Sequence, residues 1–101
     1  MIDEALYEKI CRRIDSYRQD MIDLQAALTA IPAVGPANGG DGETPKGAFL
    51  EKRLMEMGFT DFRHFDAPDS QVSSGFRPNF FTALAGQNPA RRVWIITHLD
   101  I

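Results

Sequence analysis

The sequence predicts an α/β fold: a layered α/β/α arrangement with a long N-terminal helix, a second helix and three strands of a mixed sheet. Three observations predict it. Apolar residues recur at helical spacing over residues 2–30, a second helical pattern follows residue 44, and short apolar or aromatic runs occupy residues 59–101. The chain has 101 residues, which is enough for one domain at most, so we treat residues 1–101 as a single piece of structure.

Residues 2–30 are expected to form one long helix that Pro32 ends. From Ile14 onward the apolar spacing is strictly heptad, so a coiled coil is an alternative. Because that spacing persists for fewer than three heptads, an amphipathic helix lying against a sheet is the simpler interpretation. The side chains that share the apolar face are Leu6, Ile10, Ile14, Tyr17, Met21, Leu24, Leu28 and Ile31.

The second helix is expected to follow a loop over residues 33–42, which is rich in Gly, Pro and Asn and lacks any phosphate-binding motif. Thr44 is a plausible N-cap, Pro45 suits the first helical position, and Gly58 suits the end. The expected buried face comprises Phe49, Leu50, Leu54 and Met57.

Three strands are expected after Gly58, over residues 59–66, 79–85 and 93–97, with a polar excursion over residues 67–78. The third run, Val93 to Thr97, is apolar without alternation, which predicts a strand covered on both faces in the middle of a sheet. Phe80, Phe81 and Trp94 are expected in the core.

Composition excludes several classes of protein. The formal net charge is −3, which argues against a nucleic-acid partner, and the single cysteine, Cys11, excludes an intrachain disulfide. No apolar run approaches the roughly 18 residues of a membrane span, and the acidic residues Asp3 and Glu4 do not suit a signal peptide. We therefore expect a soluble, cytoplasmic protein.

The residues best placed for chemistry are His98 and Asp100, which directly follow the third apolar run. In open α/β sheets, ligands collect outside the carboxyl ends of the strands. Residues two apart in an extended segment project to the same side, so His98 and Asp100 can address one site as a metal ligand and its orienting carboxylate. His64 is expected to have a structural or surface role, and Cys11 is expected to be buried as a small apolar group.

The order of elements resembles the N-terminal region of the acetylornithine deacetylase / succinyl-diaminopimelate desuccinylase family of zinc-dependent metallohydrolases and metallopeptidases. The resemblance rests on Ile31-Pro32, the loop after it, the helix that Thr44-Pro45 opens, and the apolar strand followed by His98-Leu99-Asp100-Ile101. Ala33 departs from the family, which often has Ser after Ile-Pro.

The resemblance implies an incomplete catalytic domain that hydrolyses an amide bond of an N-acyl amino acid or small peptide at a two-zinc site. His98 would be a terminal zinc ligand, and Asp100 would orient it as the catalytic-site carboxylate. One imidazole also suits cobalt or manganese. The remaining ligands and the general base cannot be carried over, so these residues alone are expected to be inactive and to bind zinc poorly.

Self-association of this piece is expected from uncovered strand edges, and a homodimeric parent protein from the resemblance. Two other interpretations stay open. One is a free-standing α/β interaction module in which His98 and Asp100 are incidental. The other is a helical oligomerisation element driven by residues 14–31.

Overall fold

The computed structural model describes residues 1–101, which form two compact units, Met1–Ala30 and Ile31–Ile101. The first unit holds α1 (Glu4–Ser16) and α2 (Arg18–Ala30). The second holds a 3₁₀ turn η1 (Pro36–Asn38), α3 (Thr44–Glu56) and four short strands: β1 (Phe62–His64), β2 (Ala67–Pro68), β3 (Phe76–Arg77) and β4 (Phe80–Thr82). Helices and strands are thus both present, as an α/β chain requires. No helix is both long enough and apolar enough for a membrane crossing.

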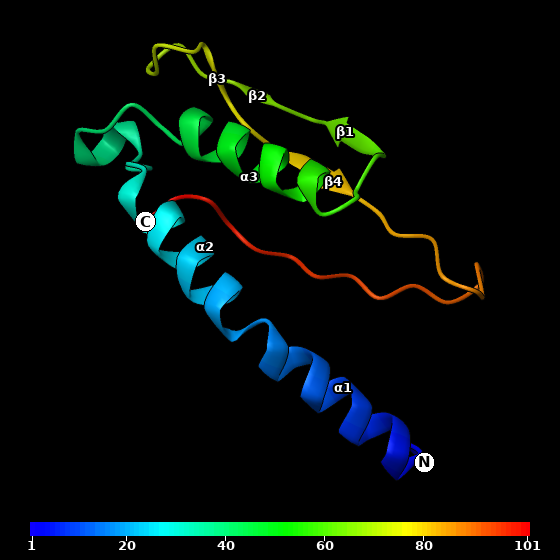
Figure 1. The fold of residues 1–101 in the computed structure, drawn as a ribbon. Coiled ribbons are helices and arrows are strands. Elements are labelled where there is room, and N and C mark those ends of the chain that lie inside the picture. The colour runs from blue at the N-terminus through cyan, green and yellow to red at the C-terminus, as the bar shows by residue number, and fades with distance from the viewer. The chain divides into compact units, whose positions relative to one another are not determined.

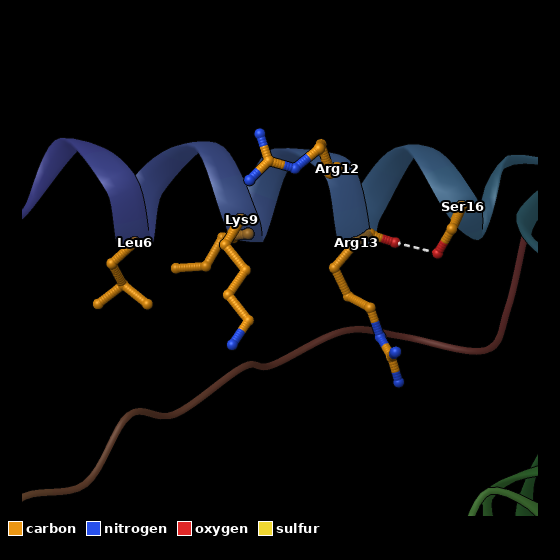
Figure 2. A pocket seen from close by; sticks show the side chains of 6 residues that line it. Leu6, Lys9, Arg12, Arg13 and Ser16 are labelled. Carbon is orange, nitrogen blue, oxygen red and sulfur yellow. Dashed lines mark hydrogen bonds between the residues drawn. The ribbon is translucent and has the colours of Figure 1, made fainter.

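The first unit is two helices, so the prediction of one continuous helix over residues 2–30 is wrong at Tyr17. Figure 1 shows α2 continuing from α1 after a short non-helical link. The Ser16 hydroxyl donates a hydrogen bond of 2.6 Å to the Arg13 carbonyl, which Figure 2 shows as a dashed line. That carbonyl is the acceptor that the Tyr17 N–H would use in a continuous helix, and the Tyr17 N–H instead donates to the Ile14 carbonyl at 2.9 Å.

The boundaries of α3 follow its sequence closely. Pro45 lies in the first turn, as predicted, but Glu43 is the N-cap residue and the Thr44 hydroxyl donates to Ser74 instead. At the other end Gly58 has φ +101°, a left-handed conformation that favours glycine. The Gly58 N–H donates to the Met55 carbonyl and the Phe59 N–H to the Leu54 carbonyl, which is the hydrogen-bond pattern of a Schellman C-terminus.

The face of α3 is less buried than predicted. Phe49, Leu50 and Leu54 are half-buried, whereas Met57 is exposed. The buried apolar side chains of the chain are Ala33 and Val72, which belong to loops that flank the N-terminal end of this helix.

The four strands form two antiparallel pairs instead of a mixed sheet. β1 pairs with β4, with Phe62 opposite Thr82 and His64 opposite Phe80, and β2 pairs with β3. Figure 1 shows the strands running alongside α3. Two of the predicted strands are confirmed in shortened form, and the predicted polar excursion contains the small β2–β3 ladder.

The prediction of a third, buried strand over residues 93–97 is wrong. These residues are extended but have no strand partner, and Val93, Ile95 and Ile96 are 92%, 90% and 90% exposed. An extended segment becomes a strand only when a neighbouring backbone supplies hydrogen-bond partners, and no other segment of the chain lies in that position. Residues 93–97 thus have the apolar composition of a buried strand but are exposed to solvent in this chain.

The aromatic side chains lie on both sides of the β1–β4 pair. The Phe62 and Phe80 rings approach to 6.2 Å and are half-buried. On the opposite side the Phe81 ring stacks on that of Phe65 at 5.7 Å and meets Trp94 edge-on at 6.3 Å. These last three residues are exposed, so the expectation that Phe81 and Trp94 belong to the core is wrong.

Candidate functional site

His98 and Asp100 lie in the extended C-terminal segment, which two further contacts beside that of Trp94 with Phe81 attach to the rest of its unit. The Ile101 N–H donates a hydrogen bond of 3.2 Å to the carbonyl of the buried Ala33. The Leu99 side chain lies against α3 at Gly47, where an added Cβ would be 3.4 Å from Leu99 Cδ1. Leu99 is half-buried, whereas His98 and Asp100 are exposed. The alternation expected of an extended segment is therefore confirmed here.

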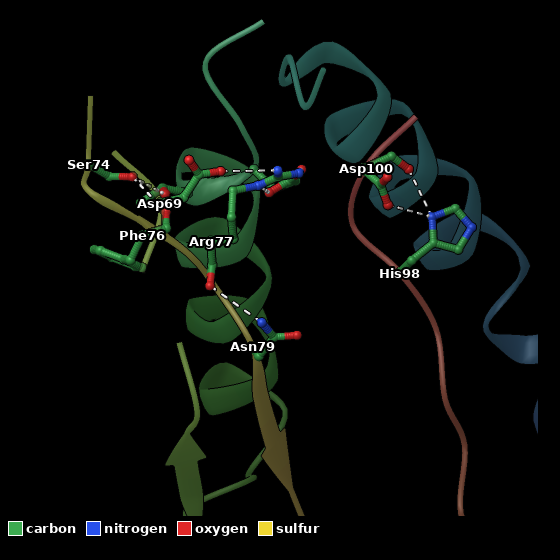
Figure 3. Close-up of polar contacts among 9 residues, drawn as sticks. Asp69, Ser74, Phe76, Arg77, Asn79, His98 and Asp100 are labelled. Atoms are coloured by element: carbon green, nitrogen blue, oxygen red, sulfur yellow. Dashed lines mark hydrogen bonds and ion pairs between the residues drawn. The ribbon is translucent and has the colours of Figure 1, made fainter. Parts of the chain in front are cut away.

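The two side chains contact each other directly. His98 Nδ1 lies 3.0 Å from Asp100 Oδ1 and 2.9 Å from the Asp100 backbone oxygen, as Figure 3 shows. Both partners are acceptors, so Nδ1 carries the proton and donates it to them. The lone pair of the neutral ring is then on Nε2, which has no hydrogen-bond partner within the chain. The side chain of His98 is 81% exposed, so Nε2 is open to an incoming ion.

In metal sites, a carboxylate that bonds one nitrogen of a histidine ligand fixes the tautomer and makes the other nitrogen more basic, and the contact between His98 and Asp100 has that geometry. It supplies one ligand only. No group of three or more His, Cys, Asp or Glu side chains in the chain could hold a metal ion together. The pair thus fits one corner of a metal centre and lacks the other ligands that zinc requires.

A second His-x-Asp sequence, His64-Phe65-Asp66, has the same spacing but a different geometry. His64 Nε2 lies 2.8 Å from Glu51 Oε1 on α3, and Nδ1 lies 3.9 Å from Asp66 Oδ1. Asp66 Oδ1 instead accepts the Asn79 N–H at 3.0 Å. Since Nε2 already bonds a carboxylate of its own unit, this histidine joins β1 to α3, and the structural role expected of it is consistent with these contacts.

An ion pair that sequence reasoning missed joins the start of α3 to β3. Arg77 Nε donates to Glu43 Oε2 at 2.6 Å, and the Arg77 Nη2 group donates to the other carboxylate oxygen. Asp69 Oδ2 lies 3.5 Å from Nη1, in the cluster that Figure 3 shows. Glu43 is 5% exposed. The hydrogen bonds to Glu43 are the main reason that the pKa of Arg77 is raised, so the guanidinium stays charged and the pair is structural.

Hydroxyl and carboxylate groups line a neighbouring cavity of about 280 Å³ at the N-terminal end of α3, between that helix and the turn after β2. Asp41 accepts the Ser73 N–H at 2.7 Å and also the Ser73 hydroxyl proton. Both hydrogen bonds lower the pKa of Asp41, and the bond from the Ser73 hydroxyl has the larger effect. Thr44 donates to the Ser74 hydroxyl at 3.0 Å, which donates onward to the Phe76 carbonyl at 2.8 Å. Each group has a partner, so the cavity wall is a structural network.

The sequence carried no local signal for these long-range contacts, because Glu43 and Arg77 are 34 positions apart and belong to no recognisable motif. Sequence reasoning also passed over the fact that His64 and Asp66 have the same two-residue spacing as His98 and Asp100. Comparisons with protein-family models, with curated proteins and with solved structures found no match for this chain.

Proposed function

We propose that this chain is the N-terminal part of the catalytic domain of a metal-dependent amidohydrolase or exopeptidase, with His98 as a terminal ligand of a two-zinc site. The substrate class is an N-acyl amino acid or small peptide, whose amide bond is hydrolysed. The proposal rests on the resemblance of the chain order and of the His98-Leu99-Asp100 sequence to the acetylornithine deacetylase / succinyl-diaminopimelate desuccinylase family.

The observation that supports it best is the contact of His98 Nδ1 with Asp100, which leaves Nε2 exposed. A histidine in this state needs no change of tautomer or rotamer to bind a metal ion through Nε2. Leu99, packed against α3 at Gly47, keeps both polar side chains on the open side of the segment.

Asp100 acts through His98. Its carboxylate accepts a hydrogen bond from Nδ1–H, so it fixes the ring plane and increases electron density at Nε2. If zinc were bound there, it would polarise the amide carbonyl and lower the pKa of a bound water molecule to near 7. In the proposal, the other ligands and the general base come from parts of the parent protein outside residues 1–101.

A second candidate function is a non-catalytic interaction or oligomerisation module. The exposed apolar face of α1 favours it, because Leu6, Ile10 and Ile14 are all about half exposed. In that case His98 and Asp100 would be incidental, and no metal dependence would follow.

The experiment compares metal binding and hydrolysis by the protein that the parent gene encodes, purified with its metal. We expect His98→Ala to remove one zinc per chain and to abolish hydrolysis of a panel of N-acyl amino acids. Asp100→Asn keeps the size of the side chain but weakens the hydrogen bond, so zinc affinity should fall about 10–100-fold.

His64→Ala is the matched control, since it removes the histidine of the other His-x-Asp sequence. It should leave zinc content and hydrolysis intact. If His98→Ala retained full zinc and activity, or if both histidine variants lost zinc equally through unfolding seen by circular dichroism, the assignment to His98 would be wrong. For residues 1–101 alone, isothermal titration with Zn²⁺ should show no nanomolar one-to-one site.

A further inference from the structure

The unit formed by α1 and α2 has an apolar face that nothing in the unit covers. No residue of either helix is buried. Exposure of the apolar side chains that line α1 and the start of α2 ranges from 42% for Tyr17 to 57% for Tyr7. In heptad notation this face has Tyr7, Ile14, Met21 and Leu28 at positions a, with Ile10, Tyr17 and Leu24 at positions d. This is the stripe of a coiled-coil seam.

Three charged side chains flank the stripe and lack an opposite charge within the chain, Arg13 and Asp20 at positions g and Arg18 at position e. Arg13 and Asp20 both lie at position g, directly before an a position. Arg13 lines a groove of about 520 Å³ beside Leu6 and Ile10, and Figure 2 shows it projecting to the same side as Leu6, away from Arg12. Its Nε donates to the Tyr17 hydroxyl at 2.9 Å, and it makes no ion pair. Asp20 has neither an ion pair nor a side-chain hydrogen bond.

These positions become complementary when two copies meet in antiparallel orientation. If Ile14 of one copy faces Tyr17 of the other, Ile10 faces Met21 and Tyr7 faces Leu24, and each pair occurs twice. In antiparallel coiled coils g positions face g positions, and this register places Arg13 of each copy beside Asp20 of the other. We infer that the α1–α2 face binds the same face of a second copy of this chain, antiparallel, with two Arg13–Asp20 ion pairs.

A parallel pair is disfavoured by the same charges. In a parallel coiled coil a g residue faces the e residue five positions later on the partner. Arg13 would then face Arg18 of the other copy, twice, and Asp20 would face the uncharged Gln25. Like charges at these positions oppose association.

The break at Tyr17 is compatible with the antiparallel pair. The twofold axis of this register passes between Ile14 and Tyr17, which is where α1 ends and α2 begins. The twofold symmetry makes the layers on either side of the crossing point equivalent. This inference is independent of the metal site.

The test is sedimentation velocity on the full chain over a range of concentrations, with charge-reversal variants. Asp20→Arg alone, or Arg13→Asp alone, places like charges at both g–g contacts and should raise the dimer dissociation constant about tenfold. An equimolar mixture of the two variants restores both pairs and should recover the wild-type constant as a heterodimer. Asp23→Arg, the same reversal at the outward position c, is the matched control and should change little.

Other outcomes overturn the inference. A chain that stays monomeric at every concentration would refute the antiparallel pair. A parallel pair would respond differently, since Arg13→Asp would then strengthen association and Asp20→Arg would leave it unchanged. Recovery in the mixed sample also shows that neither variant has lost its fold, which circular dichroism checks separately.

Discussion

Substituting Gly40 tests the loop to which the candidate metal ligand is attached. A Cβ on Gly40 would lie 2.0 Å from the Val34 carbonyl oxygen and 2.5 Å from its carbon. These are backbone atoms, so no side-chain rotation relieves the overlap. The loop must open, and it then loses the Gly42 N–H bond to Val34 at 2.9 Å and the Gly40 N–H bond to Gly35 at 3.1 Å. At about 1 kcal/mol for each hydrogen bond, plus disturbance of the buried Ala33, Gly40→Ala should lower the free energy of unfolding by about 3 kcal/mol.

The matched variant is Gly39→Ala, one residue earlier. Gly39 has φ +80°, but a Cβ there meets nothing within 4 Å, so the cost is the left-handed conformation alone, about 1 kcal/mol. Urea unfolding followed by circular dichroism gives both values. Amide exchange gives a local readout, because the Ile101 N–H bonds to Ala33 in the same loop and should lose protection in Gly40→Ala only. Equal costs for the two variants would refute the argument from backbone overlap.

Three further outcomes are expected. Thr82 Oγ1 is buried without a hydrogen-bond partner, so Thr82→Val should raise the free energy of unfolding by about 1 kcal/mol in a urea titration; a loss would mean that the hydroxyl has a partner. Ser16→Ala frees the Arg13 carbonyl for the Tyr17 N–H, so ¹³Cα shifts should become helical across the α1–α2 junction, and unchanged shifts would place the cause of the break elsewhere. The hydrogen bonds from Ser73 lower the pKa of Asp41 in the folded state below its ordinary 3.8, so the stability that they contribute is present above pH 3.8 and is lost as the pH falls through the folded pKa. Asp41→Asn should therefore flatten the acid side of the profile of stability against pH, measured by thermal unfolding. An unchanged profile would contradict this.

The local elements were predictable because their causes lie within a few residues of one another. Pro45 and Gly58 bracket α3, and both act through their own backbone conformations. The two-residue spacing of His98 and Asp100 in an extended segment permits their contact but does not ensure it, since His64 and Asp66 have the same spacing without a hydrogen bond between them. The break at Tyr17 was also local, but Ser16 can either donate back to the preceding turn or point to solvent, and the pattern of apolar residues does not distinguish these states.

Sequence alone therefore determined where helical segments occur and where α3 starts and stops, but neither the break at Tyr17 nor which histidine bonds the aspartate two residues after it. Tertiary structure decided the rest. It paired Arg77 with Glu43, placed the His64 ring in hydrogen-bond contact with Glu51, and left residues 93–97 without a neighbouring strand. The physical reason is that hydrogen-bond ladders and buried ion pairs need partners far along the chain. The spacing of residues within one segment does not determine which distant residue makes the contact.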